Sequence, residues 1–525
     1  MTKENHNHIS KYARHFFSGT LLSRVSGMVR DISMAALFGD HPSVAAFMVA
    51  FRFSHFLRRL LGEGTLQSIF IPHYEELRLK EEKKASTFFF KLYVLLTSAL
   101  LTLILLVEGT INFTISSQNE VLHLFAWMFP SLLFISLYGI NLSLLQCKNA
   151  FFSSSVAPFA CNLVWILAIF IFAKEEPSQA MIYLASFTLI GFMIQWIITL
   201  PKTWGVLVEG KRHLSSPIFS IPQEIRTIGK ATLFGLIGVT AVQMNSFLDM
   251  IFARYADVKG PIYLWYAIRL EQLPLAVIGL ACVYSITPSL SRHIKANALD
   301  KAQNLFSFGH TRILLLVVPC TFAIFALGLP SVNLLFGRGN FSLMAVTETT
   351  GCLWAYGLGL LSSTLTVYQS SLFYAYGDYK TPMIASFLSV VSNIALNSLF
   401  VFYFHFGALS IALSTSLSSW LNYLVLKRSF SNKGYWKIEY PHPSTFWKIS
   451  FVSVIACISC LTFDHFFLSS FLLTRSTTNQ LIHLIGNSSI FIITFALSLL
   501  LLYKEIFLEL KGFLFSKEIP KATNP

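Results

Sequence analysis

Long apolar stretches recur along the whole chain and are separated by short polar segments. Each is about 20 residues long, the length that an α-helix needs to cross the hydrocarbon core of a bilayer. They lie at about 15–37, 44–71, 87–112, 119–146, 154–173, 179–200, 229–255, 262–290, 309–331, 345–372, 382–404, 407–426, 447–468 and 482–503. The pattern predicts an all-α polytopic membrane protein with about 14 transmembrane helices.

The composition agrees with a membrane protein. Of 525 residues, 54% are hydrophobic and 12% are charged, whereas soluble domains carry about 25% charged residues. The first apolar stretch has no small-residue cleavage site, so we expect it to stay in the mature chain rather than act as a secretion signal. The seven cysteines fall in or beside predicted spans. We interpret them as packing residues, including Cys457 and Cys460, which have metal-ligand spacing but no second pair.

Lysine and arginine are concentrated in alternate loops, as expected if those loops are cytoplasmic. These positions are Lys3, Lys11, Arg14, Arg78, Lys80, Lys83, Lys84, Lys202, Lys211, Arg212, Arg292, Lys295, Lys301, Lys427, Arg428, Lys433, Lys437, Lys504 and Lys511. The opposite loops hold few such residues. The bias predicts an even number of spans with both termini in the cytoplasm. It accounts for much of the net charge of +14, so we do not expect nucleic acid binding.

Two halves of the chain resemble each other. Three pairs of residues share the same separation of 217 positions: Asp40 and Asp257, Arg52 and Arg269, and Gly62 and Gly279. Asn162 and Asn393 are a further echo, each deep in the fifth span of its half. A period of this length contains six predicted spans. Because six is even, the halves insert in the same orientation, which is the parallel-repeat class of transporter with its substrate site between the halves.

The repeat predicts the domain organisation. Residues 1–200 form an N-terminal six-helix lobe, 201–225 a linker rich in Pro, Gly and Ser, and 226–430 a C-terminal six-helix lobe. Residues 431–525 contain two extra transmembrane helices outside the repeat. Matched charges at the same depth in both lobes favour a functional reason for the duplication.

Several predicted spans carry charges where hydrocarbon is expected. Those of the first lobe are Arg24, Arg30 and Asp31 in 15–37, and Arg52, Arg58, Arg59 and Glu63 in 44–71. At about 100° per residue, the charges of the second span and His55 fall within an arc of roughly 140°. An ionisable group at mid-span costs about 2.5–3.5 kcal/mol, so such groups usually face a water-filled cavity or the bundle interior.

The second lobe adds Asp249 and Arg254 in 229–255, and Arg269 and Glu271 in 262–290. The inner surface is therefore net cationic, and arginine forms two-pronged hydrogen bonds with phosphate. The sequence predicts an anion site, best suited to a phosphate or diphosphate, with Arg24, Arg30, Arg58, Arg269, Arg52 and Arg59 as candidate ligands. Simpler readings stay open. Arg30 with Asp31, and Arg59 with Glu63 at i,i+4, could form ordinary ion pairs. Arg59 and Arg254 could extend to an interface.

No motif for chemical catalysis is found in the sequence. It lacks the G-x-x-x-x-G-K-[ST] phosphate loop, the HExxH zinc motif and the G-x-S-x-G nucleophile elbow. We therefore expect a transporter rather than an enzyme, with no cofactor. Its driving force would come from ions such as Na⁺, from the membrane potential or from the substrate gradient.

The segments "SRVSGMVRD" and "AFRFSHFLRRLLGEGTLQSIFIPHYEE" closely resemble the first two spans of the MurJ (MviN) lipid II flippases. These belong to the multidrug/oligosaccharidyl-lipid/polysaccharide exporter superfamily. "YAIRLEQLPLAVIG" and "GDYKTP" continue the resemblance in the second half, and it extends over essentially the full chain.

The resemblance implies a flippase of the bacterial cell inner membrane that serves peptidoglycan biosynthesis. It implies alternating access that moves undecaprenyl-diphosphate-linked disaccharide-pentapeptide, lipid II, to the periplasmic leaflet. Its partners would be lipid II, membrane lipids and a cell-wall synthesis complex. The family's functional arginines correspond to Arg24, Arg30, Arg58 and Arg269, and its last two helices line a groove for the lipid tail.

The resemblance also bears on ion coupling. It places Na⁺ coordination near Asp249 and the Asp378 region, and Asp31 and Glu63 are further candidates for ion coupling or gating. Ala45 and Ile268 stand where the family often has acidic residues, which leaves the predicted cleft more positive.

Three rival functions stay open. A flippase for another polyprenyl-diphosphate oligosaccharide shares the same anion chemistry. An ion-coupled multidrug exporter of the same superfamily needs buried carboxylates, for which Asp31 and Asp249 are candidates. A membrane scaffold for cell-wall enzymes should tolerate neutral replacements of the arginines.

Overall fold

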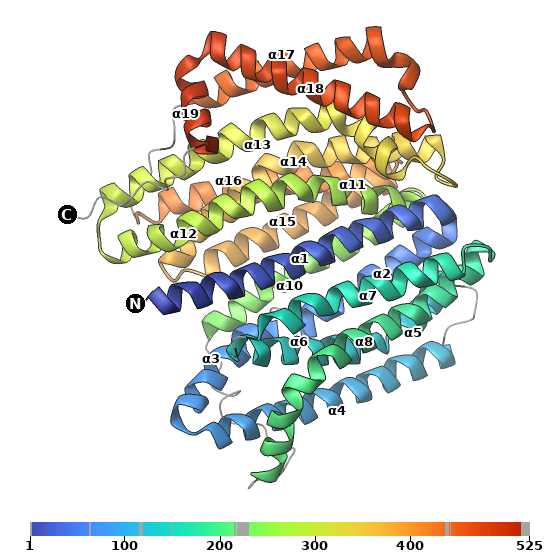
Figure 1. Ribbon diagram of the computed structural model, residues 1–525, viewed down its shortest axis with the longest axis vertical. Coiled ribbons are helices and arrows are strands. Elements are labelled where there is room, and N and C mark those ends of the chain that lie inside the picture. The colour runs from blue at the N-terminus through green and yellow to red at the C-terminus, as the bar shows by residue number, and fades with distance from the viewer. Residues whose placement is uncertain are drawn as a thin grey trace. The chain divides into compact units, whose positions relative to one another are not determined.

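The computed structural model describes residues 3–61, 65–114, 119–148, 150–214, 217, 230–435, 440 and 443–515. Throughout these ranges the chain folds into helices joined by short turns, with no strand (Figure 1). The all-α class predicted from the apolar pattern is therefore confirmed.

Seven of the described helices are long and apolar enough to cross a membrane. The number rises to eight if Glu120–Met128 and Ser131–Cys147, which are bent by 43° at a short break, form one span. The count of about 14 transmembrane helices stays a prediction.

The described residues form two compact units, and the first comprises those within 1–262 and 339–341. Its helices are α1 (Lys3–Phe38), α2 (Pro42–Leu61), α3 (Thr65–Lys80), α4 (Glu82–Thr114), α5 (Glu120–Met128), α6 (Ser131–Cys147), α7 (Phe151–Ile171), α8 (Pro177–Arg212) and α10 (Lys230–Ala256). In this unit α7 packs against both α1 and α8, and α10 packs against α2. Phe247 of α10 stacks on Phe53 and Phe56 of α2, with ring centroids 4.6 and 6.0 Å apart.

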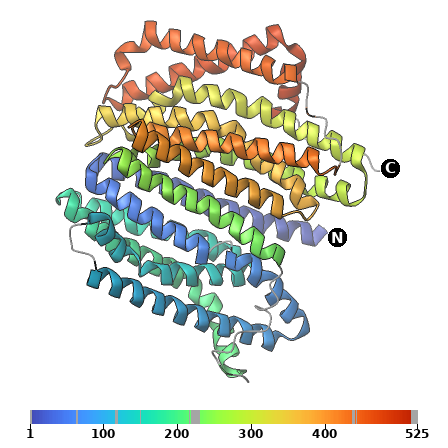
Figure 2. The same ribbon diagram turned by 180° about the vertical axis from the view of Figure 1, so that it is seen from behind.

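The second unit comprises the described residues within 263–338 and 342–525. Its elements are most of α11 (Gly260–Pro274), the π-helical turn η1 (Leu275–Gly279), α12 (Leu280–Lys295), α13 (Leu299–Phe336), α14 (Leu343–Ala375), α15 (Lys380–Ser398), η2 (Leu399–Tyr403), α16 (Leu409–Asn432), α17 (Pro443–Phe463), η3 (Asp464–Leu468), η4 (Ser469–Phe471), α18 (Thr477–Leu502) and α19 (Lys504–Phe515). Here α14 packs against α16 and α13, and the pair α17–α18 packs against α13 (Figure 2).

Aromatic and small apolar residues form the packing contacts of the second unit. Phe306 and Tyr368 stack with their centroids 5.1 Å apart, and the Tyr368 hydroxyl donates to the Phe306 carbonyl oxygen at 3.0 Å. Cys457 and Cys460 are free thiols buried between α13, α17 and α18. Their interpretation as packing residues is confirmed.

The two units group residues by the contacts they make. A grouping of this kind shows where helices pack, whereas the lobes follow from sequence similarity between two halves. The lobe boundaries at 1–200, 226–430 and 431–525 stay predictions, as does the tail groove along the last two spans.

Candidate functional site

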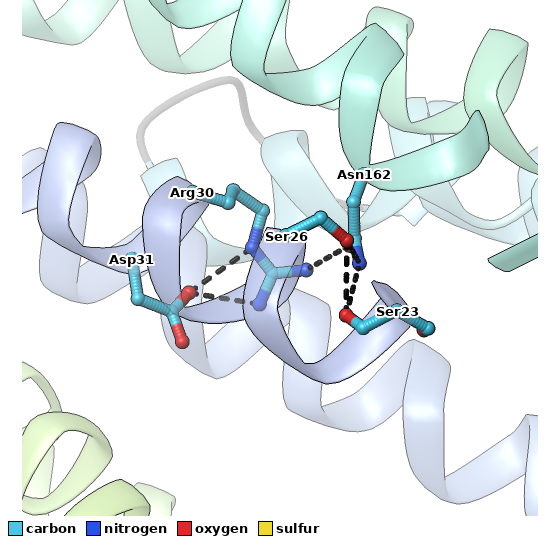
Figure 3. A network of polar contacts seen from close by, with 5 residues as sticks. All are labelled: Ser23, Ser26, Arg30, Asp31 and Asn162. Atoms are coloured by element: carbon cyan, nitrogen blue, oxygen red, sulfur yellow. Dashed lines mark hydrogen bonds and ion pairs between the residues drawn. The ribbon is translucent and has the colours of Figure 1, made fainter. Parts of the chain in front are cut away.

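Arg30 lies on α1, and almost all of its side chain is enclosed. Its Nε and Nη2 donate to Asp31 Oδ1 at 3.0 and 2.8 Å, and its Nη1 donates to Asn162 Oδ1 at 3.1 Å (Figure 3). The guanidinium also lies 4.2 Å from the ring centroid of Trp165. Arg30 is 7% exposed and Asp31 is 4% exposed. A buried cation is tolerated here because it has a carboxylate, an amide oxygen and an aromatic face as partners.

Asn162 comes from α7 and joins two turns of α1. Its Nδ2 donates to the Ser23 carbonyl oxygen at 3.0 Å and to Ser26 Oγ at 2.9 Å (Figure 3). Ser26 Oγ in turn donates to the Ser23 carbonyl oxygen at 3.0 Å. This network, made of Ser23, Ser26, Arg30, Asp31 and Asn162, is called the α1–α7 network below.

Arg24 differs from Arg30 although both lie on α1 in the same predicted site. The side chain of Arg24 is exposed. The structure therefore separates the two arginines into an exposed cation and an enclosed one.

The second span provides fewer described side chains. Arg52 and His55 are half-buried on α2, and the His55 ring packs against Phe51 and Phe192 with centroids 4.3 and 6.5 Å away. Arg58 and Arg59 lie on α2, but their side chains are outside the part of the chain that is described, and Glu63 is outside it altogether.

The turn between α1 and α2 is bound to the turn between α10 and α11. Lys259 Nζ donates to Asp40 Oδ2 at 2.7 Å, and the Lys259 backbone N–H donates to Asp257 Oδ1 at 2.8 Å. Arg254 Nη1 donates to the Pro42 carbonyl oxygen at 3.0 Å. The repeat-related carboxylates Asp40 and Asp257 thus both bind Lys259.

Residues 339–341 are in close backbone contact with the end of α1 and with the α1–α2 turn. The Asn340 N–H donates to the Ala36 carbonyl oxygen at 2.9 Å, and Asn340 Nδ2 donates to the Leu37 carbonyl oxygen at 2.6 Å. Gly39 and Gly339 have φ of +61° and +55°. A Cβ at Gly39 would lie 2.2 Å from the Asn340 carbonyl oxygen, and one at Gly339 would lie 2.1 Å from the Ala36 carbonyl oxygen. Both positions therefore need glycine.

In the second unit Arg269 lies on α11 with its guanidinium 4.7 Å from the ring centroid of Trp265, one turn earlier. Glu271, two residues further, is 7% exposed. Each unit thus holds a candidate arginine against a tryptophan: Arg30 on Trp165 and Arg269 on Trp265. Stacking on a ring fixes the plane of a guanidinium and favours Arg over Lys at both places.

The carboxylates predicted for ion coupling occupy different surroundings. Asp249 on α10 is 5% exposed, and Asn245 Nδ2 donates to its Oδ2 at 3.4 Å. Asp378, between α14 and α15, accepts from Lys433 Nζ at 2.6 Å, Thr381 Oγ1 at 2.7 Å and the Tyr435 hydroxyl at 3.1 Å. Within the described ranges no group of three or more His, Cys, Asp or Glu side chains could hold a metal ion. Sodium coordination at Asp249 or near Asp378 stays a prediction.

Comparison with known proteins identifies the family. The profile of the family described as "Lipid II flippase MurJ" matches residues 34–485. This chain belongs to the lipid II flippase MurJ family.

Relatives of the MurJ family match most of the chain. The protein named probable lipid II flippase MurJ of Chlamydia muridarum is 32% identical over 431 residues, which cover 81% of this chain and 79% of the relative. The protein of the same name from Vibrio cholerae is 30% identical over 443 residues, covering 79% and 81%.

Solved structures share the fold. A structure titled lipid II flippase MurJ, inward closed conformation, aligns with a TM-score of 0.75 at 24% identity over 94% of this chain and 99% of that chain. An inward-facing multidrug resistance MATE family transporter aligns with a TM-score of 0.63 at 14% identity, covering 80% and 98%. The chain is therefore a multi-pass bacterial membrane protein with the fold of this transporter superfamily.

The match to the MurJ profile begins at residue 34. Arg24, Arg30 and Asp31 precede it, so the roles of these three residues rest on their own geometry and on the motif in α1. Arg52 and Arg269 lie inside the matched region.

Sequence reasoning missed several residues of the site. The shared depth of Asn162 and Asn393 is visible in the sequence, whereas the bond between Asn162 and Arg30 and the place of Trp165 are not. In the second unit Asn393 Nδ2 donates to Thr415 Oγ1 at 3.3 Å, and its Oδ1 accepts from Asn397 at 2.8 Å. The shared depth of the two asparagines was the available signal that polar contacts occur there.

The enclosure of Arg30 predicts a specific ranking of charge-preserving substitutions. Arg30→Lys should lose nearly as much transport as Arg30→Ala, because an ammonium cannot bind Asp31 and Asn162 together while stacking on Trp165. Arg24→Lys should lose less transport than Arg30→Lys, since an exposed lysine keeps the charge and one hydrogen bond to phosphate although it cannot make the two-pronged contact. Transport of the family substrate by the matched pair Arg24→Lys and Arg30→Lys would measure this. Equal retention by both variants would contradict the distinction.

The Asp378 cluster predicts an acid-dependent step in stability. Burial opposes ionisation of Asp378, but hydrogen bonds from Lys433, Thr381 and Tyr435 prevail and hold its pKa at about 2. The lowered pKa stabilises the folded chain above the ordinary value of 3.8, and this contribution is lost as the pH falls from there towards 2. We expect Asp378→Asn to lower the Tm at pH 7 but not at pH 2. The difference in Tm between the two chains, measured from pH 7 to pH 2, tests this, and a constant difference would contradict it.

Proposed function

We propose that this chain moves lipid II from the cytoplasmic to the periplasmic leaflet of the bacterial inner membrane. The observation that carries the proposal is membership of the MurJ family over residues 34–485, and the two relatives compared above share its printed name. The proposed activity is transport of an intact lipid. Enzymes of cell-wall synthesis are proposed partners on the same grounds.

The arginine chemistry supports a diphosphate as the group that the protein binds. Arg24 is exposed on α1, and Arg269 is held in plane by Trp265 in the second unit. A guanidinium donates two parallel hydrogen bonds to phosphate oxygens, and charge-assisted bonds of this kind are about twice as strong as neutral ones. A diphosphate that loses water on entering the protein therefore finds replacement donors.

Alternating access is the proposed mechanism. With the N-terminus in the cytoplasm, the α1–α2 turn lies at the outer end of the first unit. There the turn is held by the ion pair between Lys259 and Asp40 and by the contacts of Asn340 with the end of α1. Release of the head group outside requires these contacts to separate. Na⁺ at Asp249 or the membrane potential is the proposed driving force.

Growth of a bacterium depleted of its own lipid II flippase tests the proposal. Expression of this chain should restore growth and normal cell shape. Failure to restore growth, with insertion confirmed by surface labelling, would contradict it. Resistance to cationic drugs, measured on the same cells, should not change, whereas a rise in resistance would favour drug export.

A further inference from the structure

A buried histidine of α18 contacts an aspartate where α17 continues into η3. His483 Nε2 is hydrogen-bonded to Asp464 Oδ1, and Asn487 Nδ2 donates to the same oxygen at 2.8 Å. Cys460 Sγ donates to the Asn487 carbonyl oxygen at 3.3 Å. His483 and Asn487 are each 1% exposed. Asp464, His483 and Asn487, called the α17–α18 cluster below, therefore join two helices that pack side by side (Figure 1).

Polar contacts with α13 hold the turn between α17 and α18. Gln480 Nε2 donates to the Thr474 carbonyl oxygen at 2.8 Å and to Asn333 Oδ1 at 3.3 Å. Asn333 Nδ2 donates to the same carbonyl oxygen at 3.1 Å. Gln480 is three residues, about one helical turn, from His483. The α17–α18 cluster therefore lies next to a polar, fixed end of the helix pair. On the side of Cys460 the neighbours are apolar or thiol side chains: Ala326, Ala456, Cys457 and Phe491.

One ring nitrogen of His483 is buried without a hydrogen-bond partner among the described residues. This atom is Nδ1. A neutral imidazole carries one proton, so a ring that donates from Nε2 to Asp464 has a free electron pair at Nδ1, where a second proton can bind. Histidine is the side chain whose charge ordinarily changes between about pH 5 and 8. The cluster therefore contains both a place for a proton and a carboxylate to balance its charge.

A neutral histidine bonded to a permanently ionised aspartate is the alternative. A carboxylate at membrane depth costs free energy when its charge is not balanced, because little water is present to stabilise it. Asn487 is a neutral donor, and the ion-pair contact of Asp464 is with His483. A proton on His483 makes this contact a charge-assisted hydrogen bond and leaves the pair without net charge. The two residues therefore bind the proton as a unit.

The pair is open to protons through its aspartate. The Asp464 side chain is 17% exposed, compared with 1% for His483, and the predicted topology places the α17–α18 turn outside the cytoplasm. Arg338 and Arg475 adjoin the carbonyl groups that Gln480 binds, about one turn from His483. His483 is the single titratable residue in the sequence of α18. The other titratable or charged side chains around this end are Cys457, Cys460, His465, Arg338 and Arg475.

We propose that the α17–α18 cluster is a proton-binding site at the outer ends of α17 and α18. A proton bound by His483 against Asp464 holds the two ends together, and its loss loosens them. The two helices outside the repeat thereby respond to the acidity of the medium outside the cell. The inference does not depend on which lipid the protein transports.

Nitrogen NMR of the purified full chain with isotope-labelled histidine measures the proton directly. The chain has 14 histidines, and the signal missing from His483→Gln identifies His483. We expect His483 to change from neutral to doubly protonated between about pH 8.5 and about pH 5.5. Asp464→Asn keeps the shape of the side chain but removes its charge, so it should weaken proton binding by His483 about tenfold or more. A protonation state of His483 that stays constant over this range would overturn the proposal.

Thermal unfolding in detergent tests whether the proton holds the helices together. His483→Gln keeps an N–H donor for Asp464 but cannot take up a proton. A proton that binds to the folded chain stabilises it, as any ligand of the folded state does, so this stabilisation is present in acid and is lost as the pH rises. The unsubstituted chain should have a higher Tm than His483→Gln at about pH 5.5, and the difference should shrink towards zero at about pH 8.5.

His465→Gln is the matched control. His465 follows Asp464 in the sequence but is exposed, and its ring contacts Phe466 with centroids 5.3 Å apart. This variant also loses one imidazole and should keep the pH dependence of the Tm. If His483→Gln fails to fold, Asp464→Asn should show the same loss of pH dependence. A Tm difference between the unsubstituted chain and His483→Gln that is constant with pH would show a purely structural contact and contradict the proposal.

Discussion

Replacing Arg269 by alanine is expected to abolish rescue of bacteria that lack their own lipid II flippase, while the chain still inserts in the membrane. Arg269 is one of the two described arginines that we assign to the diphosphate, and Trp265 holds it in plane. Hydrogen bonds to a charged group contribute about 1.5–3 kcal/mol each. Losing a two-pronged contact should therefore slow transport by about 100-fold or more. Arg24→Ala should have the same effect, and growth on each variant alone provides the measurement.

Arg292→Ala is the matched control for these variants. Arg292 is exposed near the end of α12, where its Nη2 donates to Ser289 Oγ at 2.9 Å. The substitution removes one exposed positive charge and should leave growth normal. Normal growth on Arg269→Ala or Arg24→Ala would contradict the assignment of a cationic site. Loss of growth with all three variants would point to charge-dependent insertion instead.

Gly339→Ala is expected to have the second largest effect, because Gly339 packs against the backbone at the end of α1. The added Cβ would lie 2.1 Å from the Ala36 carbonyl oxygen, and φ at this position is +55°. The left-handed backbone alone costs about 1–2 kcal/mol for a residue with a side chain, and overpacking adds about 1–3 kcal/mol. The contact with Asn340 should therefore open, and both the Tm and lipid II transport should fall sharply.

Gly377→Ala separates these two costs. Gly377 has φ of +73°, but a Cβ there meets nothing within 4 Å. This variant should lose only the backbone term and retain transport. Thermal unfolding of the two purified variants in one detergent gives the comparison. Equal losses of Tm would show that steric contact at Ala36 contributes nothing.

The apolar pattern predicted the helices because a membrane span must satisfy its own backbone and face lipid, and both requirements are visible in the sequence. It also identified the charged positions of α1 and α2. The repeat predicted that Asp40 and Asp257 are related, and the structure adds that Lys259 binds both. Features that depend on residue type and on helical periodicity could therefore be predicted from the sequence.

Contacts between distant segments could not be predicted from the sequence. Asn162 and Arg30 are 132 residues apart, and helical periodicity on α7 shows which face is buried but not which residue of α1 it meets. The sequence therefore placed Arg24 and Arg30 in one class, although one is exposed and the other enclosed. Gly39 and Gly339 likewise matter only because of the backbone that each approaches.

The most direct test of the central claim measures which leaflet holds lipid II. Bacteria depleted of their own flippase would express this chain, and a membrane-impermeant reagent would report lipid II head groups exposed on the outer leaflet. We predict that the chain restores exposure to the level of undepleted cells and that Arg269→Ala does not. Lipid II that stays inaccessible in cells with confirmed insertion of the unsubstituted chain would contradict lipid II transport.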